Sequence, residues 1–286
     1  MGSLIGGRFK VLGPLAEGEL STVYRARDTQ TDQPIALKCL SPDLCRDTDA
    51  LLRFERECRV LAKLRHPHLI GLVKMGWRGA LPWLAMPLLP GQPLSEVLQP
   101  ELPATASQTL AFVRQIGAAL SFLHANALVH RDVKPSNVFV DAAGTLTLLD
   151  LGVAHDMQSL ITRPGLRIGT VTTMAPEQIR GQPIDERTDE YAFAVVVYRM
   201  LTGRAPFRGE QQAVLRAHLT EPAPDAHAVN PAVPPGVARA LRQAMAKQPS
   251  DRFPTLAALC ERLELLLEAP ATFPMPPPPP TSRRSR

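Results

Sequence analysis

The stretch HRDVKPSN at residues 130–137, with DLG following at 150–152, decides how the rest of this chain is interpreted. Asp132 in the first stretch is a carboxylate at the position that accepts the proton of a substrate hydroxyl. Lys134 is a cation placed to lie near a phosphate group during its transfer. HRD alone is a weak signal, but the whole stretch followed by DLG rarely arises by chance.

Two oxygen-bearing side chains complete this pattern. Asn137 supplies a carboxamide and Asp150 a carboxylate, and both are hard oxygen ligands of the kind that Mg²⁺ takes, with Mn²⁺ as an alternative ion. The sequence therefore predicts phosphoryl transfer assisted by a divalent cation bound between these two residues.

The composition is typical of a globular protein. The 286 residues are 45% hydrophobic and 21% charged, which is enough for a large core in one bilobal domain or two small ones. The net charge is +5, partly from a basic C-terminal end. Aromatic residues are only 5% and no zinc-finger or base-stacking pattern occurs, so nucleic acid is not expected as a partner.

The cysteine pattern and the hydropathy of the sequence indicate the cellular compartment of the protein. The four cysteines form no CxxC pair, which disfavours a zinc site and is typical of free thiols in a reducing compartment. No run reaches the roughly 18 apolar residues that a membrane span needs, and the N-terminus lacks the apolar core of a signal peptide. We therefore expect a cytoplasmic protein with no membrane span.

Hydrophobic periodicity predicts a β-rich first part. Alternating apolar residues between turns predict strands at 9–12, 21–26 and 35–40. Apolar residues at steps of three and four predict a helix at 48–65. The first part is thus expected to be a small antiparallel sheet with one main helix.

After Gly91 the pattern becomes mostly helical. The predicted elements are a helix at 105–124, strands at 138–140 and 146–149, and helices at 188–202, 210–219, 234–246 and 255–267. The expected fold class is α+β with two lobes, at residues 1–90 and 91–268. Residues 269–286 form a proline-rich basic tail that is expected to be extended or disordered, either as a spacer or as a ligand for a proline-binding partner.

A turn of small residues follows the first predicted strand. Gly18 lies between Ala16 and Ser21, where a phosphate-covering loop of the GxGxxG kind has two further glycines. Both replacements are small, so backbone N–H groups of this turn could still face phosphates. Lys38 on the third strand could reach the same phosphates, and it needs a carboxylate such as Glu57 on the following helix to hold it.

Glu55 competes with Glu57 for this role. Two helical steps rotate the two side chains by about 200° relative to each other. Glu57 shares the expected core face of Leu61 and Leu64, whereas Glu55 points outward. Glu57 is therefore the predicted partner of the lysine.

The connection between the two lobes could bind a nucleotide base through its backbone. Pro87 has a carbonyl but no N–H and so suits the acceptor position, while Leu89 keeps its N–H as the donor. Four apolar residues are candidates to sandwich the base, although each could equally be part of the core: Val23, Ala36, Met86 and Phe139.

Taken in order, these motifs resemble the catalytic domain of the eukaryotic-like (Hanks-type) serine/threonine protein kinases of bacteria. The resemblance extends over about residues 8 to 265. It implies a bilobal protein-kinase-like fold that transfers the γ-phosphate of ATP to serine or threonine hydroxyls of protein substrates. It also implies that Asp132 is the catalytic base.

The resemblance assigns roles to residues outside this loop. Glu177 and Arg252 resemble a buried ion pair that braces the activation segment. Asp189 resembles a helix residue that accepts hydrogen bonds from the catalytic-loop backbone. Lys134 and Thr170 mark the subclass that acts on serine and threonine rather than on tyrosine.

Regulation by autophosphorylation is a further implication. Arg131 resembles an arginine that binds a phosphorylated residue of the activation segment and so orders that segment. Thr162 is the first candidate for this modification, and Thr172 or Thr173 is the second. A homodimer that phosphorylates itself in trans is an expected assembly.

Two other functions stay open at this level. The turn around Gly18 lacks two glycines, which would suit a pseudokinase or a nucleotide-binding scaffold with weakened use of ATP. A small-molecule phosphotransferase of related fold would explain the catalytic aspartate and asparagine. It would not explain the Gly-Thr and Ala-Pro-Glu motifs that shape a peptide-binding surface.

Overall fold

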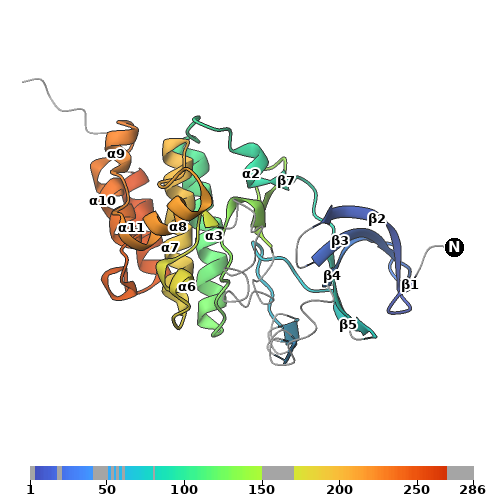
Figure 1. Ribbon diagram of the computed structural model, residues 1–286. Helices are drawn as coiled ribbons and strands as arrows, with labels where there is room; N and C mark the ends of the chain where they lie inside the picture. The colour runs from blue at the N-terminus through green and yellow to red at the C-terminus, as the bar shows by residue number, and fades with distance from the viewer. Residues whose placement is uncertain are drawn as a thin grey trace, which may run out of the picture.

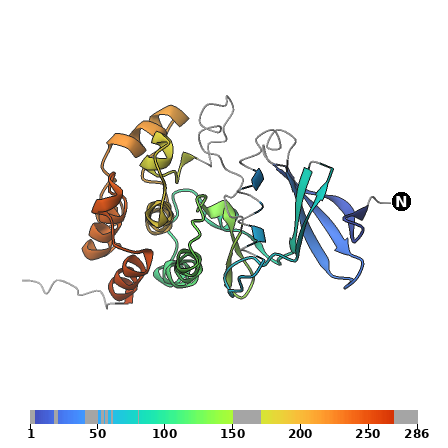
Figure 2. The same ribbon diagram turned by 90° about the horizontal axis from the view of Figure 1, so that it is seen from below.

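The computed structural model of the chain has two lobes, one built from a sheet and one built mainly from helices (Figure 1). The structure describes residues 4–17, 21–40, 51–52, 55, 58–59, 62–79, 81–149 and 171–268. The view from below shows the same separation, with the strands of the smaller lobe on one side and the helices on the other (Figure 2). The predicted α+β bilobal fold is confirmed.

The smaller lobe is a six-stranded antiparallel sheet in the order β1-β2-β3-β4-β6-β5. The strands are β1 (Leu4–Ile5), β2 (Phe9–Glu17), β3 (Ser21–Asp28), β4 (Pro34–Leu40), β5 (Lys74–Arg78) and β6 (Leu81–Pro87). The strands predicted at 9–12, 21–26 and 35–40 are therefore present. Strands β1 to β4 lie side by side in the order in which they follow one another along the chain, because short turns connect them.

The two faces of this sheet have different roles because side chains alternate along a strand. Ile35 and Leu37 on β4 are buried in a cluster with Phe9 and Trp83. The Trp83 ring lies so close to Gly76 that a Cβ there would come within 2.3 Å of it, so this strand position needs glycine. Residues of β4 between the buried ones face the opposite side, where the candidate nucleotide site lies.

The larger lobe is built from eight α-helices and two 3₁₀ turns within the described residues. The helices are α2 (Leu94–Val97), α3 (Ala106–Ala125), α6 (Pro176–Arg180), α7 (Glu186–Thr202), α8 (Gln211–Thr220), α9 (Ala226–Val229), α10 (Pro235–Ala244) and α11 (Leu256–Glu268), and the 3₁₀ turns are η2 (Pro135–Asn137) and η4 (Pro249–Asp251). The helices predicted at 105–124, 188–202, 210–219, 234–246 and 255–267 are all present. The short α2, α6 and α9 were not predicted, because fewer than six residues carry no periodicity.

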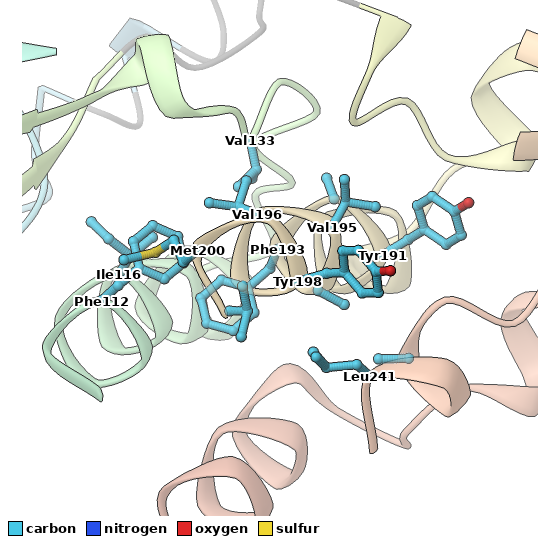
Figure 3. Close-up of a cluster of buried hydrophobic side chains, with 14 of the residues drawn as sticks. Phe112, Ile116, Val133, Tyr191, Phe193, Val195, Val196, Tyr198, Met200 and Leu241 are labelled. Carbon is cyan, nitrogen blue, oxygen red and sulfur yellow. The ribbon is translucent and has the colours of Figure 1, made fainter. Parts of the chain in front are cut away.

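Helix α7 is the centre of the larger lobe (Figure 3). Phe193 of α7 stacks on Phe112 of α3 with ring centroids 5.2 Å apart. On other sides α7 meets Leu241 of α10 and Val133 of the loop that carries the HRD motif. Each buried aromatic or aliphatic side chain of this kind stabilises the fold by about 1.5–3 kcal/mol.

A small three-stranded sheet joins the two lobes. It has the order β7-β8-β9, with β7 (Gln92–Pro93), β8 (Val138–Val140) and β9 (Leu146–Leu148). Leu148 donates its N–H to His68 O at 2.9 Å and accepts from Ile70 N at 2.9 Å. The segment that precedes β5 is thereby fixed beside β9, the strand that comes shortly before position 150.

Some expectations fall on residues outside those described. Half of the helix predicted at 48–65 is among them; residues 51–52, 55 and 58–59 are helical. Residues 62–65 are turn or irregular, so the predicted end of this helix at 65 is wrong. Cys45 and the tail at 269–286 also lie outside. Cys39 and Cys260 are free thiols. Among the described helices, none combines the length and the apolar character that crossing a membrane requires.

Helix α7 also buries a carboxyl group, which makes stability depend on pH. Glu190 is fully buried, with Oε1 accepting from Phe253 N at 3.0 Å and Oε2 lacking a hydrogen-bond partner among the described residues. Burial raises the pKa of Glu190 to about 8. The folded chain thus holds this proton more tightly than the unfolded chain, and stability falls as the pH rises from about 4.5 to about 8.

We expect Glu190→Gln to remove the loss of folding stability between about pH 4.5 and pH 8. The variant should gain on the order of 2–4 kcal/mol of unfolding free energy relative to the parent between pH 5 and pH 8, since each pKa unit is worth about 1.4 kcal/mol. Chemical denaturation at several pH values measures the difference. Glu261→Gln, an exposed site on α11, is the matched control and should show no such trend. A constant difference across this range would contradict a buried, protonated Glu190.

Candidate active site

The loop between α3 and β8 brings three of the predicted catalytic side chains together. Lys134 Nζ lies 2.7 Å from Asp132 Oδ2, and both side chains are mostly buried. Asn137 Nδ2 donates to Asp132 Oδ2 and to Asp132 O, both at 2.8 Å. Because its nitrogen is committed to Asp132, Asn137 has its Oδ1 atom left to coordinate a cation. The Asp132 carboxylate is therefore held in one orientation by a cation and an amide.

The same loop is fastened to the strand that leads to Asp150. Leu149 donates its N–H to Asn137 O at 2.8 Å, and His130 Nε2 donates to Leu149 O at 2.7 Å. His130 Nδ1 is then the ring atom that accepts from Asp132 N, at 3.3 Å. Asp150 lies outside the described residues, but its neighbour Leu149 is bonded directly to Asn137. The loop that carries Asn137 is thus hydrogen-bonded to the residue that precedes Asp150.

Asp189 of α7 fixes the backbone of the HRD loop through hydrogen bonds. Its carboxylate accepts from His130 N at 2.7 Å and from Arg131 N at 2.8 Å. Arg131 has φ of 70°, a left-handed conformation that costs energy for a residue with a side chain. The two hydrogen bonds to a buried charge stabilise that conformation. The predicted role of Asp189 agrees with these contacts.

The candidate nucleotide face of the sheet is the side opposite the Trp83 cluster. In the strand register Ala36 lies opposite Met86, Lys38 opposite Val23, and Ala16 opposite Val23 on the other side. Residues directly opposite each other point to the same face. Five of the predicted nucleotide-site residues therefore share one surface. Val23, Ala36, Lys38 and Met86 are half-buried there, and Ala16 is exposed.

The helix that follows β4 packs on this same face. Cys58 is fully buried in a cluster with Leu40 and Leu84, which lie on the Lys38 side of the sheet. Glu57 is the residue before Cys58 but lies outside the described residues, as does Gly18 in the turn between β2 and β3. The described part of this helix thus packs on the face of the sheet that carries Lys38.

The predicted base-binding connection begins where β6 ends. Pro87 is the last residue of β6 and pairs with Ile35, and Leu88 donates its N–H to Pro34 O at 3.4 Å. Leu89 follows as a half-buried residue outside the sheet. Phe139 on β8 is half-buried at the start of the larger lobe. These positions come from both sides of the junction between the lobes.

A buried ion pair connects α6 to the segment before α11. Arg252 donates through Nη1 and Nη2 to the two carboxylate oxygens of Glu177, each at 2.8 Å. Burial alone would raise the pKa of Glu177, but hydrogen bonds and attraction from Arg252 outweigh it and lower the pKa. Thr188 Oγ1 also donates to Glu177 at 2.9 Å, and Arg252 Nη1 donates to Arg187 O at 2.7 Å. The predicted ion pair between Glu177 and Arg252 is present, and both carboxylate oxygens and both Nη atoms form hydrogen bonds.

The segment after position 170 is fixed by a chain of hydrogen bonds. His218 Nε2 donates to Thr172 O at 3.2 Å, so its Nδ1 accepts from the Tyr191 hydroxyl at 2.9 Å. Lys247 Nζ donates to Ala217 O at 3.2 Å and lies over the Tyr191 ring. Burial lowers the pKa of His218 to about 4 and that of Lys247 to about 8. His218 is thus neutral at physiological pH and keeps this tautomer.

The predicted phosphorylation sites fall on both sides of the described boundary. Thr162 and Thr170 lie outside the described residues. Thr172 is half-buried, whereas Thr173 is 6% exposed. Of the two described candidates, Thr172 is therefore the more accessible to a second molecule.

A model of the protein kinase domain matches residues 9–263 of the chain. The chain belongs to the protein kinase family. Members of this family in general use ATP and a divalent metal ion. The match includes β2 to β6 of the sheet lobe, the catalytic loop and the Glu177–Arg252 pair, and it nearly coincides with the resemblance predicted over about residues 8 to 265.

Curated bacterial kinases are similar over most of the chain. The DNA damage-responsive serine/threonine-protein kinase RqkA of Deinococcus radiodurans is 38% identical over 92% of the chain. PrkC of Bacillus subtilis is 33% identical over 89%, and PknL of Mycobacterium tuberculosis is 34% identical over 93%. The chain spans 40% of the length of RqkA and of PrkC and 67% of the length of PknL.

Solved kinase domains have the same fold. The kinase domain of Mycobacterium tuberculosis PknI matches with a TM-score of 0.76 and 26% identity, covering 93% of this chain and 98% of that one. A mutant form of the same domain matches with a TM-score of 0.74 and 26% identity, covering 92% of this chain and 99% of that one.

Three residues that position the kinase loops were not predicted. His124, in the last turn of α3, has Nε2 2.8 Å from Asp189 Oδ2. Gln178 of α6 donates to Arg131 O at 2.8 Å, which ties α6 to the HRD motif. His218 reaches Thr172 as described above. None of the three has a local sequence signal, since each contacts a residue more than 40 positions away.

Proposed function

We propose that this chain is an ATP-dependent serine/threonine protein kinase that acts on protein substrates. The observation that carries the proposal is the catalytic loop, in which Asp132 is held by both Lys134 and Asn137. Phosphoryl transfer needs positioned charged groups and no covalent intermediate with the protein, and this loop supplies such groups. The named relatives, which are serine/threonine kinases, support the same activity.

In the proposed reaction Asp132 orients a substrate hydroxyl and takes its proton as the oxygen bonds to the γ-phosphorus. The bond from that phosphorus to the bridging oxygen of ATP breaks in the same step, which leaves ADP. Lys134, 2.7 Å from Asp132, stabilises the negative charge on the transferred group. Thr170 would bond to Asp132 and Lys134 as in kinases that act on serine and threonine.

The residues around the site fit a nucleotide and Mg²⁺. Asn137 Oδ1 and the carboxylate of Asp150 are oxygen donors suited to Mg²⁺, or to Mn²⁺ in its place, and the ion would neutralise charge on the phosphates. Lys38, held by Glu57, would contact the phosphates under the turn of Gly18. The base would lie among the apolar side chains and bond to the backbone of the connection after β6.

Several features beyond the reaction belong to the proposal. A phosphorylated Thr162 or Thr172 would bind Arg131 and order the activation segment. The division between lobes would fall near Gly91, and the protein would act in the cytoplasm. Phosphorylation in trans would take a transient homodimer. A proline-binding partner for the tail at 269–286 stays a prediction.

We expect Lys38→Met to lower kcat/KM for peptide phosphorylation about 10²–10³-fold, the loss typical of removing one preorganised contact to a developing charge. Phosphate incorporation from labelled ATP with Mg²⁺ measures it, and mass spectrometry locates the modified residues. Lys10→Met is the matched control, because Lys10 is an exposed lysine on β2, two strands away from β4 in the same sheet.

The control should keep parental activity within about twofold, as surface substitutions usually do. Equal activity in Lys38→Met and the parent would contradict the proposed phosphate contact. A parent chain that binds ATP but transfers no phosphate to any protein would instead support the pseudokinase alternative. In that case the turn between β2 and β3 would be the first segment to restore to GxGxxG.

A further inference from the structure

Arg199 is the exception on the buried helix α7. Almost every side chain from Thr188 to Thr202 is buried, whereas Arg199 is only half-buried. Its side chain lines a cavity of about 190 Å³, together with the side chains of Arg204 and Arg208. Three arginines thus line one cavity of the larger lobe.

The charge of this cavity is unbalanced. Glu101 is the one carboxylate among its described lining residues, and it pairs with Arg208 at an exposed rim. In the described part of the chain, no hydrogen bond or ion pair engages the side chain of Arg199 or Arg204. Burial lowers the pKa of Arg199, which means that its charge lacks full solvation. An anion bound in the cavity would supply the charge interaction that water gives to an exposed arginine.

The backbone around the cavity is rigid. Gly203 ends α7 with φ of 76°, and a Cβ there would come within 2.7 Å of the Glu101 backbone. Glu101 donates its N–H to Gly203 O at 3.0 Å. Thr202 Oγ1 lies 2.8 Å from both Tyr198 O and Arg204 O, so its single proton is shared between these two acceptors. The arginines therefore start from fixed positions, which lowers the entropy lost when they bind a ligand.

The cavity lies beside the catalytic loop. Pro135 lines it, and Pro135 is separated from Asp132 by chain that spans at most about 11 Å. Thr172 and Thr173 also line it, and Thr172 is held by His218. An extended peptide advances about 3.3 Å per residue. A side chain within about four residues of the phosphorylated one could therefore enter the cavity.

We propose that this cavity is a substrate subsite that binds an anionic side chain of the protein substrate, close in sequence to the phosphorylated serine or threonine. The inference rests on the proposed kinase activity and adds to it a substrate class. Arg199 and Arg204 bind the anion inside the cavity, and Arg208 attracts it at the rim. Arginine suits this role because its planar fork donates two parallel hydrogen bonds to a carboxylate or a phosphate.

A positional peptide scan tests the proposal. The 286-residue chain is given peptides with one threonine acceptor in a neutral background. Aspartate, asparagine, phosphothreonine or lysine is placed in turn at each position from four residues before to four after the acceptor. We expect one position at which aspartate raises kcat/KM about tenfold or more over asparagine, because a charged hydrogen bond is worth about 1.5–3 kcal/mol. Lysine at that position should lower it.

The aspartate and phosphothreonine peptides distinguish two sources of the anion. A larger gain with phosphothreonine would mean that the substrate is first modified by another kinase. A gain with aspartate alone would mean an acidic sequence. Both outcomes support an anion subsite.

Two variants link the preference to the cavity. Arg199→Gln should reduce the ratio of aspartate to asparagine turnover toward one, and Arg199→Glu should make lysine preferred at the same position. Arg239→Gln is the matched control, since Arg239 is exposed on α10 and lines no part of the cavity. This variant should keep the parental ratio. If Arg199 only stabilised the end of α7, the variants would lower the melting temperature but leave the ratio unchanged.

Failure of the subsite and failure of the kinase proposal give different results. Equal phosphorylation of all peptides by the parent would overturn the subsite and keep the kinase. If no peptide were phosphorylated, fluorescence anisotropy of labelled aspartate and asparagine peptides would still test the subsite without turnover. Equal binding of the two peptides there, or an unchanged preference in Arg199→Gln, would overturn it.

Discussion

Asp132→Asn is expected to lower kcat about 10²–10⁴-fold, the range typical of losing a general base in proton transfer. Asparagine has nearly the same shape but cannot take the hydroxyl proton. Its Oδ1 can still accept from Asn137 Nδ2, which lies 2.8 Å from the carboxylate in the parent. The loop should therefore keep its shape, and ATP affinity should change little. Steady-state phosphorylation and a separate nucleotide-binding titration measure the two quantities.

Asp32→Asn is the control for this substitution. It makes the same chemical change in an exposed turn of the sheet lobe, at φ of 58°, where asparagine is well tolerated. Activity should stay near that of the parent. A variant Asp132→Asn that kept its kcat would mean that another group takes the proton. Joint loss of nucleotide binding and activity would mean instead that the loop had collapsed.

The catalytic loop was predictable because its groups are close in sequence. Asp132, Lys134 and Asn137 lie within one turn of chain that closes through η2, so their spacing nearly fixes their geometry. The long helices and the first strands were also predictable, since each has a clear apolar period. The candidate nucleotide residues were predicted one by one, whereas their shared face became apparent only from the register of the strands.

Contacts between distant segments were not predictable in the same way. His124 meets Asp189 because α3 and α7 pack together, and a lone histidine at a helix end gives no sign of this. The arginine cavity needs the end of α7, the residues before α3 and the segment of Thr172 to meet at one place. Its charge is visible in the sequence only as scattered arginines. Packing, and not any local pattern, brings these groups together.

The second large effect is expected from Arg252→Met, which should lower the free energy of unfolding by about 3–5 kcal/mol. The substitution leaves Glu177 almost fully buried, with the Thr188 hydroxyl as the hydrogen-bond donor to its side chain among the described residues. It also removes the donor to Arg187 O. The melting temperature should fall by roughly 10 °C, and chemical denaturation measures the free energy directly.

An exposed ion pair provides the comparison. Arg27 and Asp32 lie on the surface of the sheet lobe with half or more of each side chain exposed. Arg27→Met should cost at most about 1 kcal/mol, because water screens the pair. Similar losses in the two variants would contradict the dominant role of burial at Glu177.

The pH dependence of Arg252→Met separates a lost charge partner from lost packing. In the parent the pKa of Glu177 is lowered, so the pair stabilises the fold above the unfolded pKa near 4.5, and this is lost as the pH falls. Without Arg252, burial raises the pKa of Glu177, so the variant loses stability as the pH rises above about 4.5. The difference between parent and variant should therefore shrink in acid. Adding Glu177→Gln should recover much of the loss at neutral pH, because a neutral amide needs no cation. A defect that stayed constant with pH and was not relieved by Glu177→Gln would mean that Arg252 acts by filling space beside Tyr191, over whose ring it lies.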